Sequence, residues 1–219
     1  MINKRNESID VIKGFLTLCV LVGHILLGSI NDNFARYTIY SFHMHVFMFV
    51  SGYMVNITKL SQQPYKEICI KYWNRMLKMW TIAFVLFTSY QFLALRTFSL
   101  SLLFSPWYHL WYVPTFFGYI LICRTIFTRG DEKTSYLFLL IIGIMYIFIK
   151  QFLHISLPRW CDCTYLPFFA LGVLLKNTRI LPQPKYYLIF IPVFFAVVTA
   201  TRFFSIQRVA VTFCHLWCF

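Results

Sequence analysis

The feature that most constrains this chain is a series of long apolar stretches that recurs along its whole length. A transmembrane helix needs about 20 mostly apolar residues to cross the hydrocarbon core of a bilayer. Seven stretches approach or meet this length, at residues 11–29, 39–57, 79–97, 107–127, 136–153, 160–177 and 185–204. The sequence therefore predicts an all-α, polytopic transmembrane helix bundle of about seven spans.

The composition agrees with a membrane protein. Hydrophobic residues make up 59% of the 219 residues and charged residues only 12%, whereas about 25% of a soluble domain is charged. A water-soluble fold of this size could not cover so much apolar surface, but a bilayer is itself an apolar solvent. Membrane lipid is therefore the first partner that we expect.

The basic residues indicate the orientation of the chain. The 20 Lys and Arg outnumber the 7 Asp and Glu, a balance that can indicate a nucleic-acid-binding protein. Here, however, 14 of the 20 lie in the N-terminal segment and in every second loop between the predicted spans. Because Lys and Arg accumulate in cytoplasmic loops, this alternation predicts a cytoplasmic N-terminus, a multi-pass protein of the bacterial inner membrane and no nucleic-acid partner.

The first predicted span contains two ionisable residues on one face. Lys13 and His24 are eleven positions apart, which is three helical turns plus about 20°. We expect Lys13 at the cytoplasmic boundary and His24 deep in the membrane, where an ionisable side chain suggests a function and a histidine can act as a general base. The alternatives are a histidine that only bridges two helices and an interfacial lysine paired with Asp10.

What would orient His24 is not evident from the acidic residues. None of the seven lies in the middle of a predicted span; they are Glu7, Asp10, Asp32, Glu67, Asp131, Glu132 and Asp162. His24 therefore has no obvious carboxylate partner within the membrane. A hydroxyl group, a backbone carbonyl or a residue from another segment must fix its tautomer.

Three further clusters each have a structural and a functional interpretation. His43 and His45 begin the second span and point in nearly opposite directions on a helix, so they do not form a metal pair. His109, Trp111 and Tyr112 begin the fourth span, either in an interfacial aromatic belt or at a mouth for a sugar. The basic residues 71–78 either anchor the chain on the cytoplasmic side or bind anionic phosphates.

Cys214, His215 and Cys218 offer too few ligands for a structural zinc site, and we expect no metal.

These clusters, in this order, resemble the acyltransferase-3 family of membrane-bound O-acyltransferases. The resemblance covers about residues 8–180 and is closest to the members that acetylate sugars, including the fucose O-acetylase-like branch. It is carried by Asp10, Lys13 and His24, by Phe42-His43-Met44 with Ser51-Gly52-Tyr53, by Arg75-Met76-Leu77-Lys78, by His109-Leu110-Trp111-Tyr112 and by Leu166-Pro167-Phe168-Phe169-Ala170-Leu171-Gly172. The basic position is Lys13, where many members carry Arg; lysine keeps the charge but loses the bidentate fork.

The resemblance implies transfer of an acyl group, most simply acetyl, from cytoplasmic acetyl-CoA to a hydroxyl of a cell-surface glycan or its lipid-linked precursor. His24 and Lys13 would be the catalytic residues, and Lys13, Arg75 and Lys78 would hold the donor phosphates. The implied acceptor-binding residues are His43, His109, Trp111 and Tyr112.

Two other functions fit the same sequence. A small-solute transporter could use Lys13 and His24 along its path, although the internal repeat common in transporters is missing. Because family members usually have more spans, we expect residues 1–219 to form one acyltransferase-like domain that is incomplete at its C-terminus. A non-catalytic membrane protein is the third alternative.

Overall fold

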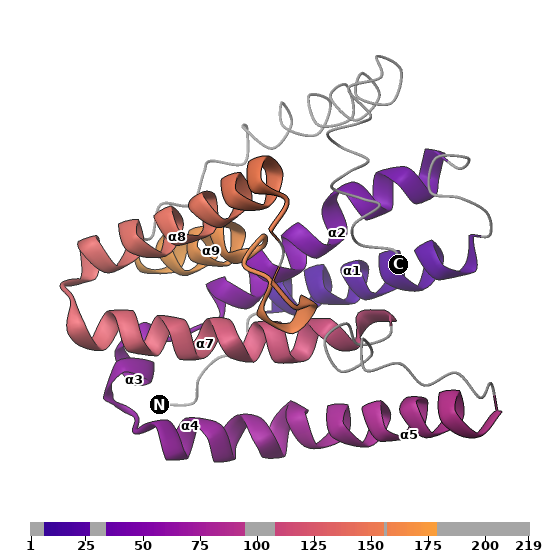
Figure 1. Ribbon diagram of the computed structural model, residues 1–219. Coiled ribbons are helices and arrows are strands. Elements are labelled where there is room, and N and C mark those ends of the chain that lie inside the picture. The colour runs from indigo at the N-terminus through magenta and orange to yellow at the C-terminus, as the bar shows by residue number, and fades with distance from the viewer. Residues whose placement is uncertain (1–6, 27–33, 95–107, 156, 179–219) are drawn as a thin grey trace. The chain divides into compact units, whose positions relative to one another are not determined.

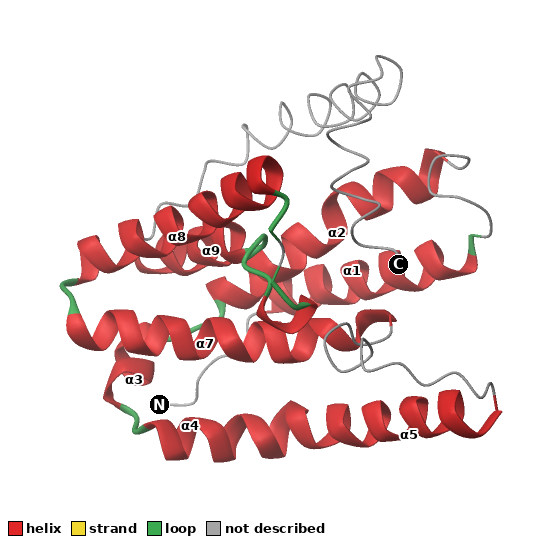
Figure 2. Ribbon diagram, viewed as in Figure 1, coloured by secondary structure: helices red, strands yellow, loops and turns green. Residues whose placement is uncertain are grey.

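The computed structural model describes residues 7–26, 34–94, 108–155 and 157–178, and every regular element within these ranges is a helix (Figures 1 and 2). The prediction of an all-α fold is thus confirmed for this part of the chain. The elements are α1 (Glu7–Ile25), α2 (Phe34–Tyr53), α3 (Ile57–Gln62), α4 (Tyr65–Tyr72), a π-helical turn (Trp73–Leu77), α5 (Lys78–Ala94), a 3-10 turn (Tyr108–Trp111), α7 (Tyr112–Arg129), α8 (Glu132–Leu153), a 3-10 turn (Arg159–Cys161) and α9 (Leu166–Thr178).

Backbone contacts divide the chain into two compact units. The first consists of Met1–Val50 with Leu175–Phe219, and the second of Ser51–Leu174. The described part of the first unit is α1, most of α2 and the last turn of α9. The helices from α3 to α8 and most of α9 belong to the second unit.

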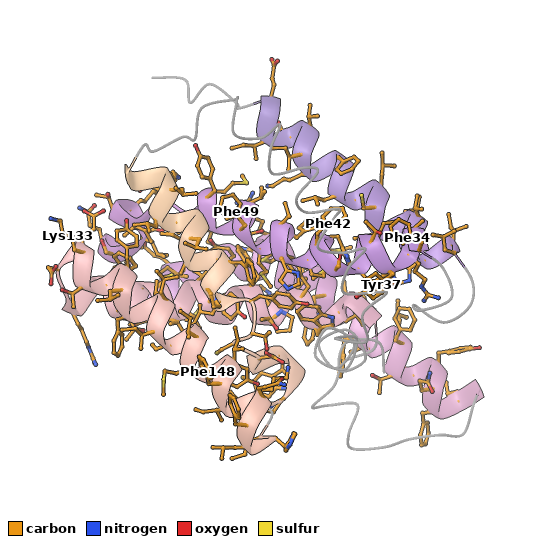
Figure 3. All side chains as sticks on the ribbon, turned by 90° about the horizontal axis from the view of Figure 1, so that it is seen from above. Phe34, Tyr37, Phe42, Phe49, Lys133 and Phe148 are labelled. Atoms are coloured by element: carbon orange, nitrogen blue, oxygen red, sulfur yellow. The ribbon has the colours of Figure 1, made fainter. Side chains whose placement is uncertain are left out.

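In the first unit, α2 is rich in aromatic side chains along its whole length; Figure 3 labels Phe34, Tyr37, Phe42 and Phe49. Tyr37 is almost completely buried, as are Met44 and Met48, about two and three helical turns further along. Spacings of seven and four residues place these three side chains on one stripe of the helix. This stripe is the buried core of α2.

The second unit is organised around α7. The helices α4 and α5 join through the π-helical turn into one long helix, Tyr65–Leu93, that runs antiparallel to α7 (Figure 1). The Tyr65 hydroxyl bonds that of Thr125, and the Trp80 indole N–H donates to the Leu110 carbonyl. The helix that contains the predicted third span, residues 79–97, therefore begins much earlier, directly after Pro64. The first half of this longer helix is helical because it packs along α7.

The loop between α7 and α8 is a short, capped turn. The Asp131 carboxylate accepts a hydrogen bond from the Thr134 backbone N–H at 3.1 Å and so caps the first turn of α8. Hydrogen bonds from Thr134, through its side chain and its backbone, lower the pKa of the Asp131 carboxyl below its ordinary value. Phe127 of α7 and Tyr136 of α8 then meet edge to face, with ring centroids 4.9 Å apart.

The sixth predicted span, residues 160–177, is helical only in its second part. α9 begins at Leu166, and a 3-10 turn and irregular backbone precede it. Pro167 sits in the first helical turn, where its missing N–H costs no hydrogen bond. The predicted seventh span, residues 185–204, lies outside the described residues.

Among the described residues, two helices are long and apolar enough to cross a bilayer: Tyr65–Leu93 and Glu132–Leu153. Only 6% and 22% of their apolar windows are buried, whereas the core helix of a soluble protein is mostly buried. The exposed apolar surface supports association with a membrane. The seven spans and the cytoplasmic N-terminus stay predictions.

Two glycines of the second unit mark places where helices touch. A Cβ atom on Gly52 would collide with the backbone carbonyl of Phe169, and one on Gly143 would lie 2.5 Å from the Pro167 ring. At both glycines, α9 lies closer to the neighbouring helix than a side chain at the glycine position would allow. Small residues at such points are typical of helix packing in membranes.

We expect Gly52→Ala to destabilise the second unit by about 1–3 kcal/mol, because the added methyl group forces α2 and α9 apart. Gly118→Ala on α7 is the matched control, since a Cβ atom there has nothing within 4 Å and alanine favours helix. Thermal unfolding of the purified proteins in detergent compares the two changes. Equal unfolding temperatures for both would contradict the Gly52–Phe169 contact.

Candidate functional site

The helix α1 carries Lys13 and His24 beside its buried face. Leu16 and Cys19 are buried, with 1% and 8% of their surfaces exposed, and Gly23 is buried with them. At about 100° per residue, Lys13 and His24 share a stripe next to this face. Lys13 is half-buried and His24 is exposed. The described helix ends at Ile25, so His24 lies in its last turn.

The hydroxyl nearest to His24 on this stripe already has a backbone partner. Thr17 Oγ1 donates a hydrogen bond of 2.8 Å to the Lys13 carbonyl. This is the usual bond of a threonine to the carbonyl one turn earlier in its own helix. This bond uses the hydroxyl proton of Thr17 and leaves its oxygen as an acceptor.

The facing helix α2 holds His43 in one defined state. Its side chain is 2% exposed, and its Nδ1 lies 2.7 Å from the Ile39 carbonyl oxygen. A carbonyl oxygen can only accept a hydrogen bond, so Nδ1 must carry the proton. In the neutral ring, Nε2 is then left with a lone pair and can act only as an acceptor.

The helices α1 and α2 meet beside both histidines. Gly23 touches Tyr40, whose ring would lie 3.0 Å from a Cβ atom on that glycine. The edge of Tyr40 packs against the His43 ring with centroids 5.1 Å apart, and the Arg36 guanidinium lies 5.5 Å from the Tyr40 ring centre. His24 follows Gly23 directly on α1. We call His24, Arg36, Tyr40 and His43 the α1–α2 cluster.

The structure thus brings the turn of α1 that carries His24 against the turn of α2 that carries His43. The resemblance implied a catalytic role for His24 and acceptor binding for His43. Arg36 and Tyr40 were not among the predicted site residues. Their signal in the sequence was weak, because an arginine and a tyrosine near the start of a span are typical of a membrane interface. Only the packing of α1 on α2 shows that they belong to the same cluster.

The predicted donor-binding residues Arg75 and Lys78 lie on the long helix rather than in a loop. Arg75 is part of the π-helical turn and Lys78 is the first residue of α5. Both are exposed, as is Lys71 one turn earlier. Spacings of four and three residues align the three basic side chains along one stripe. A π-helical turn within an α-helix is frequent at functional sites.

The predicted acceptor residues at the start of α7 have protein partners. The Trp111 ring is 4% exposed and stacks on Tyr165 with centroids 5.6 Å apart. The Tyr112 hydroxyl lies 2.8 Å from Ser51 Oγ. The backbone of His109 forms part of the 3-10 turn, and its side chain lies outside the described residues.

A buried ion pair in the second unit was missing from the predicted site. Asp162 is 5% exposed, and its carboxylate accepts hydrogen bonds from Lys150 Nζ at 2.7 Å and from the Thr164 backbone N–H at 2.8 Å. The Tyr119 hydroxyl donates to the Asp162 carbonyl at 2.6 Å. We call these four residues the Asp162 network. A lysine inside an apolar run, Lys150, was the signal that could have led to it.

Metal ligands do not gather in the part of the chain that the structure describes, where no group of three His, Cys, Asp or Glu could hold an ion. Cys214, His215 and Cys218 lie outside that part.

Comparison with known proteins gives one family and one relative. A family model for an acyltransferase domain, that of the acyltransferase-3 family, matches residues 6–212. Nodulation protein NolL of Sinorhizobium fredii is 42% identical over 65 residues, which are 26% of this chain and 18% of NolL. The aligned region thus spans less than a fifth of the relative's length. No solved structure matches the chain.

Proposed function

Because the chain belongs to the acyltransferase-3 family, we propose that it transfers an acetyl group from cytoplasmic acetyl-CoA to a hydroxyl of a cell-surface glycan or its lipid-linked precursor. The family membership supports an acyltransferase activity. The donor, the acceptor and the residue roles are the proposal. The observation that supports it most is the α1–α2 cluster, in which the turn of α1 that carries His24 contacts, through Gly23 and Tyr40, the turn of α2 that carries a buried histidine of defined tautomer.

The chemistry follows from a general base beside a thioester. The acceptor hydroxyl oxygen attacks the thioester carbonyl carbon, so a C–O bond forms and the C–S bond breaks. His24 takes the hydroxyl proton and passes it to the leaving CoA sulfur. A water-poor site favours this reaction, because fixed dipoles and charges act more strongly on the developing oxyanion.

On the donor side, the stripe of basic residues fits the phosphates of acyl-CoA. Arg75 can bind a phosphate in a bidentate manner, and Lys78 adds a second positive charge one turn away. Lys13 carries the same charge, and we assign it to the donor phosphates as the resemblance implies. This assignment keeps the donor on the side that the positive-inside pattern predicts to be cytoplasmic.

On the acceptor side, we assign His109, Trp111 and Tyr112 to binding the sugar. Aromatic rings and a histidine are suited to contact both the apolar faces and the hydroxyls of a sugar. Since Trp111 is buried against Tyr165, its part would be to shape the wall of the acceptor path.

The proposed function is tested by acyl transfer in membranes that contain the chain. Radiolabelled acetyl-CoA is added, and the label in the glycan fraction is counted against membranes without the chain. Label above that background supports the proposal. No label, with the protein shown to be inserted and both donor and acceptor extracts varied, would contradict it.

Removing the two basic side chains of the donor stripe should weaken donor binding. For Arg75→Gln with Lys78→Gln we expect the KM for acetyl-CoA to rise about 10- to 100-fold with little change in kcat, because charge-assisted bonds to phosphate are lost from ground and transition state alike. Lys59→Gln with Lys66→Gln is the matched control, since both lysines are exposed and the charge lost is the same. An equal KM in both double variants would contradict the donor assignment.

A further inference from the structure

The arrangement of α1 and α2 offers a group that can orient His24. The acids described within these helices, Glu7 and Asp10, lie in the first turn of α1, whereas His24 lies in the last turn. Neither acid is therefore buried beside His24. A histidine that acts as a base needs one ring nitrogen held so that the other carries the lone pair. Among the described residues, the α1–α2 cluster contains the side chains that meet this turn of α1.

Of these members, His43 has the right chemistry. Arg36 can only donate hydrogen bonds, so it cannot accept from an N–H of His24. His43 uses Nδ1–H for the Ile39 carbonyl at 2.7 Å, which leaves Nε2 as an acceptor within a side chain that is 2% exposed. The Tyr40 ring packs on His43 from one side and, through its contact with Gly23, connects it to the turn of α1 that carries His24.

We propose that His43 is the positioning residue for His24. Its Nε2 accepts a hydrogen bond from one ring N–H of His24 in the working enzyme, and the other nitrogen of His24 faces the acceptor hydroxyl. The Ile39 carbonyl then orients the His43 imidazole, and the His43 imidazole in turn orients the catalytic imidazole of His24. This inference rests on the proposed function and replaces the acceptor-binding role that the sequence suggested for His43.

Three substitutions of His43 separate this role from simple packing. The amide of glutamine reaches about as far as Nε2, whereas that of asparagine reaches only the position of Nδ1. Leucine fills the space without any acceptor. If His43 orients His24, His43→Gln should keep kcat within about 3-fold, and His43→Asn and His43→Leu should both lose about 10- to 100-fold, the range for loss of a partner that orients a functional histidine. The KM for acetyl-CoA should stay within about 2-fold.

The assay uses the full chain in membranes, with rates divided by the amount of inserted protein and thermal unfolding recorded for each variant. His45→Gln, two residues further on the same helix, is the matched control and should keep native kcat. His24→Ala serves as the reference for a lost base.

The possible results are distinct. High kcat in His43→Gln with low kcat in His43→Asn and His43→Leu supports the inference. Activity kept by His43→Asn and lost in His43→Gln overturns it, because only the Ile39 bond would then matter. Native kcat in His43→Leu with an inactive His24→Ala overturns the inference and leaves the proposed function intact. No transfer by the native chain overturns the proposed function, and this inference with it.

Discussion

Replacing His24 by alanine should lower acetyl transfer by at least about 100-fold, the smaller end of what a positioned general base contributes. The acceptor hydroxyl would then have to lose its proton without a positioned base. The loss should appear in kcat and in kcat/KM to the same extent, since His24 acts on the proton in transit and not on the bound donor. The measurement is the rate of labelling from acetyl-CoA per inserted molecule.

Val22→Ala provides the control for His24→Ala. Val22 lies two residues earlier on α1 and is 43% exposed, so its removal changes the same turn without touching an ionisable group. We expect it to keep native kcat. Transfer that survives in His24→Ala would leave the family membership untouched but would remove His24 from the catalytic position.

Replacing Lys150 by methionine should destabilise the protein by about 3–5 kcal/mol, because it leaves the Asp162 carboxylate buried without its cation. The two side chains are only 11% and 7% exposed, and Nζ lies 2.7 Å from Oδ2, so solvent screens the pair little. Unfolding of the purified protein by heat and by denaturant in detergent measures the effect.

A double-mutant cycle tests whether this cost comes from the pair itself. In the variant Lys150→Met with Asp162→Leu, both charges are absent, and stability should return part of the way toward native. The Thr164 backbone N–H, which donates to Asp162, would still lose its acceptor, so we expect no full recovery. A single variant Lys150→Met within about 0.5 kcal/mol of native would contradict the buried pair.

The long helix Tyr65–Leu93 shows the limit of reading spans from hydropathy. The apolar stretch that begins near residue 79 is visible in the sequence, but the preceding turns are basic and mixed in polarity. They are helical because Tyr65 and Tyr72 contact α7, through the Thr125 hydroxyl and the rings of Phe116 and Phe117. Contacts between residues so far apart in the sequence leave no local pattern.

The sequence predicted two members of the candidate site, His24 and His43, but not Arg36, Tyr40 or the contacts that join the two helices. The spacing of Lys13 and His24 on α1 placed both on one stripe, and the motif around His43 identified the second helix. The state of the His43 ring depends on the Ile39 carbonyl, and its relation to His24 depends on the meeting of Gly23 with Tyr40. Helical periodicity tells which face a residue occupies but not which helix lies opposite.

By itself, the sequence determined the all-helical class, the apolar character and the acyltransferase-3 family. These follow from composition, from the length of the apolar runs and from short motifs in a given order, all of which are local properties of the chain. Only the tertiary structure decided that Asp162 is buried with Lys150, that Gly52 and Gly143 touch α9, and that His43 is fixed next to α1. The physical reason is that burial and hydrogen-bond partners are set by side chains distant in sequence, whose contacts exist only once the helices pack.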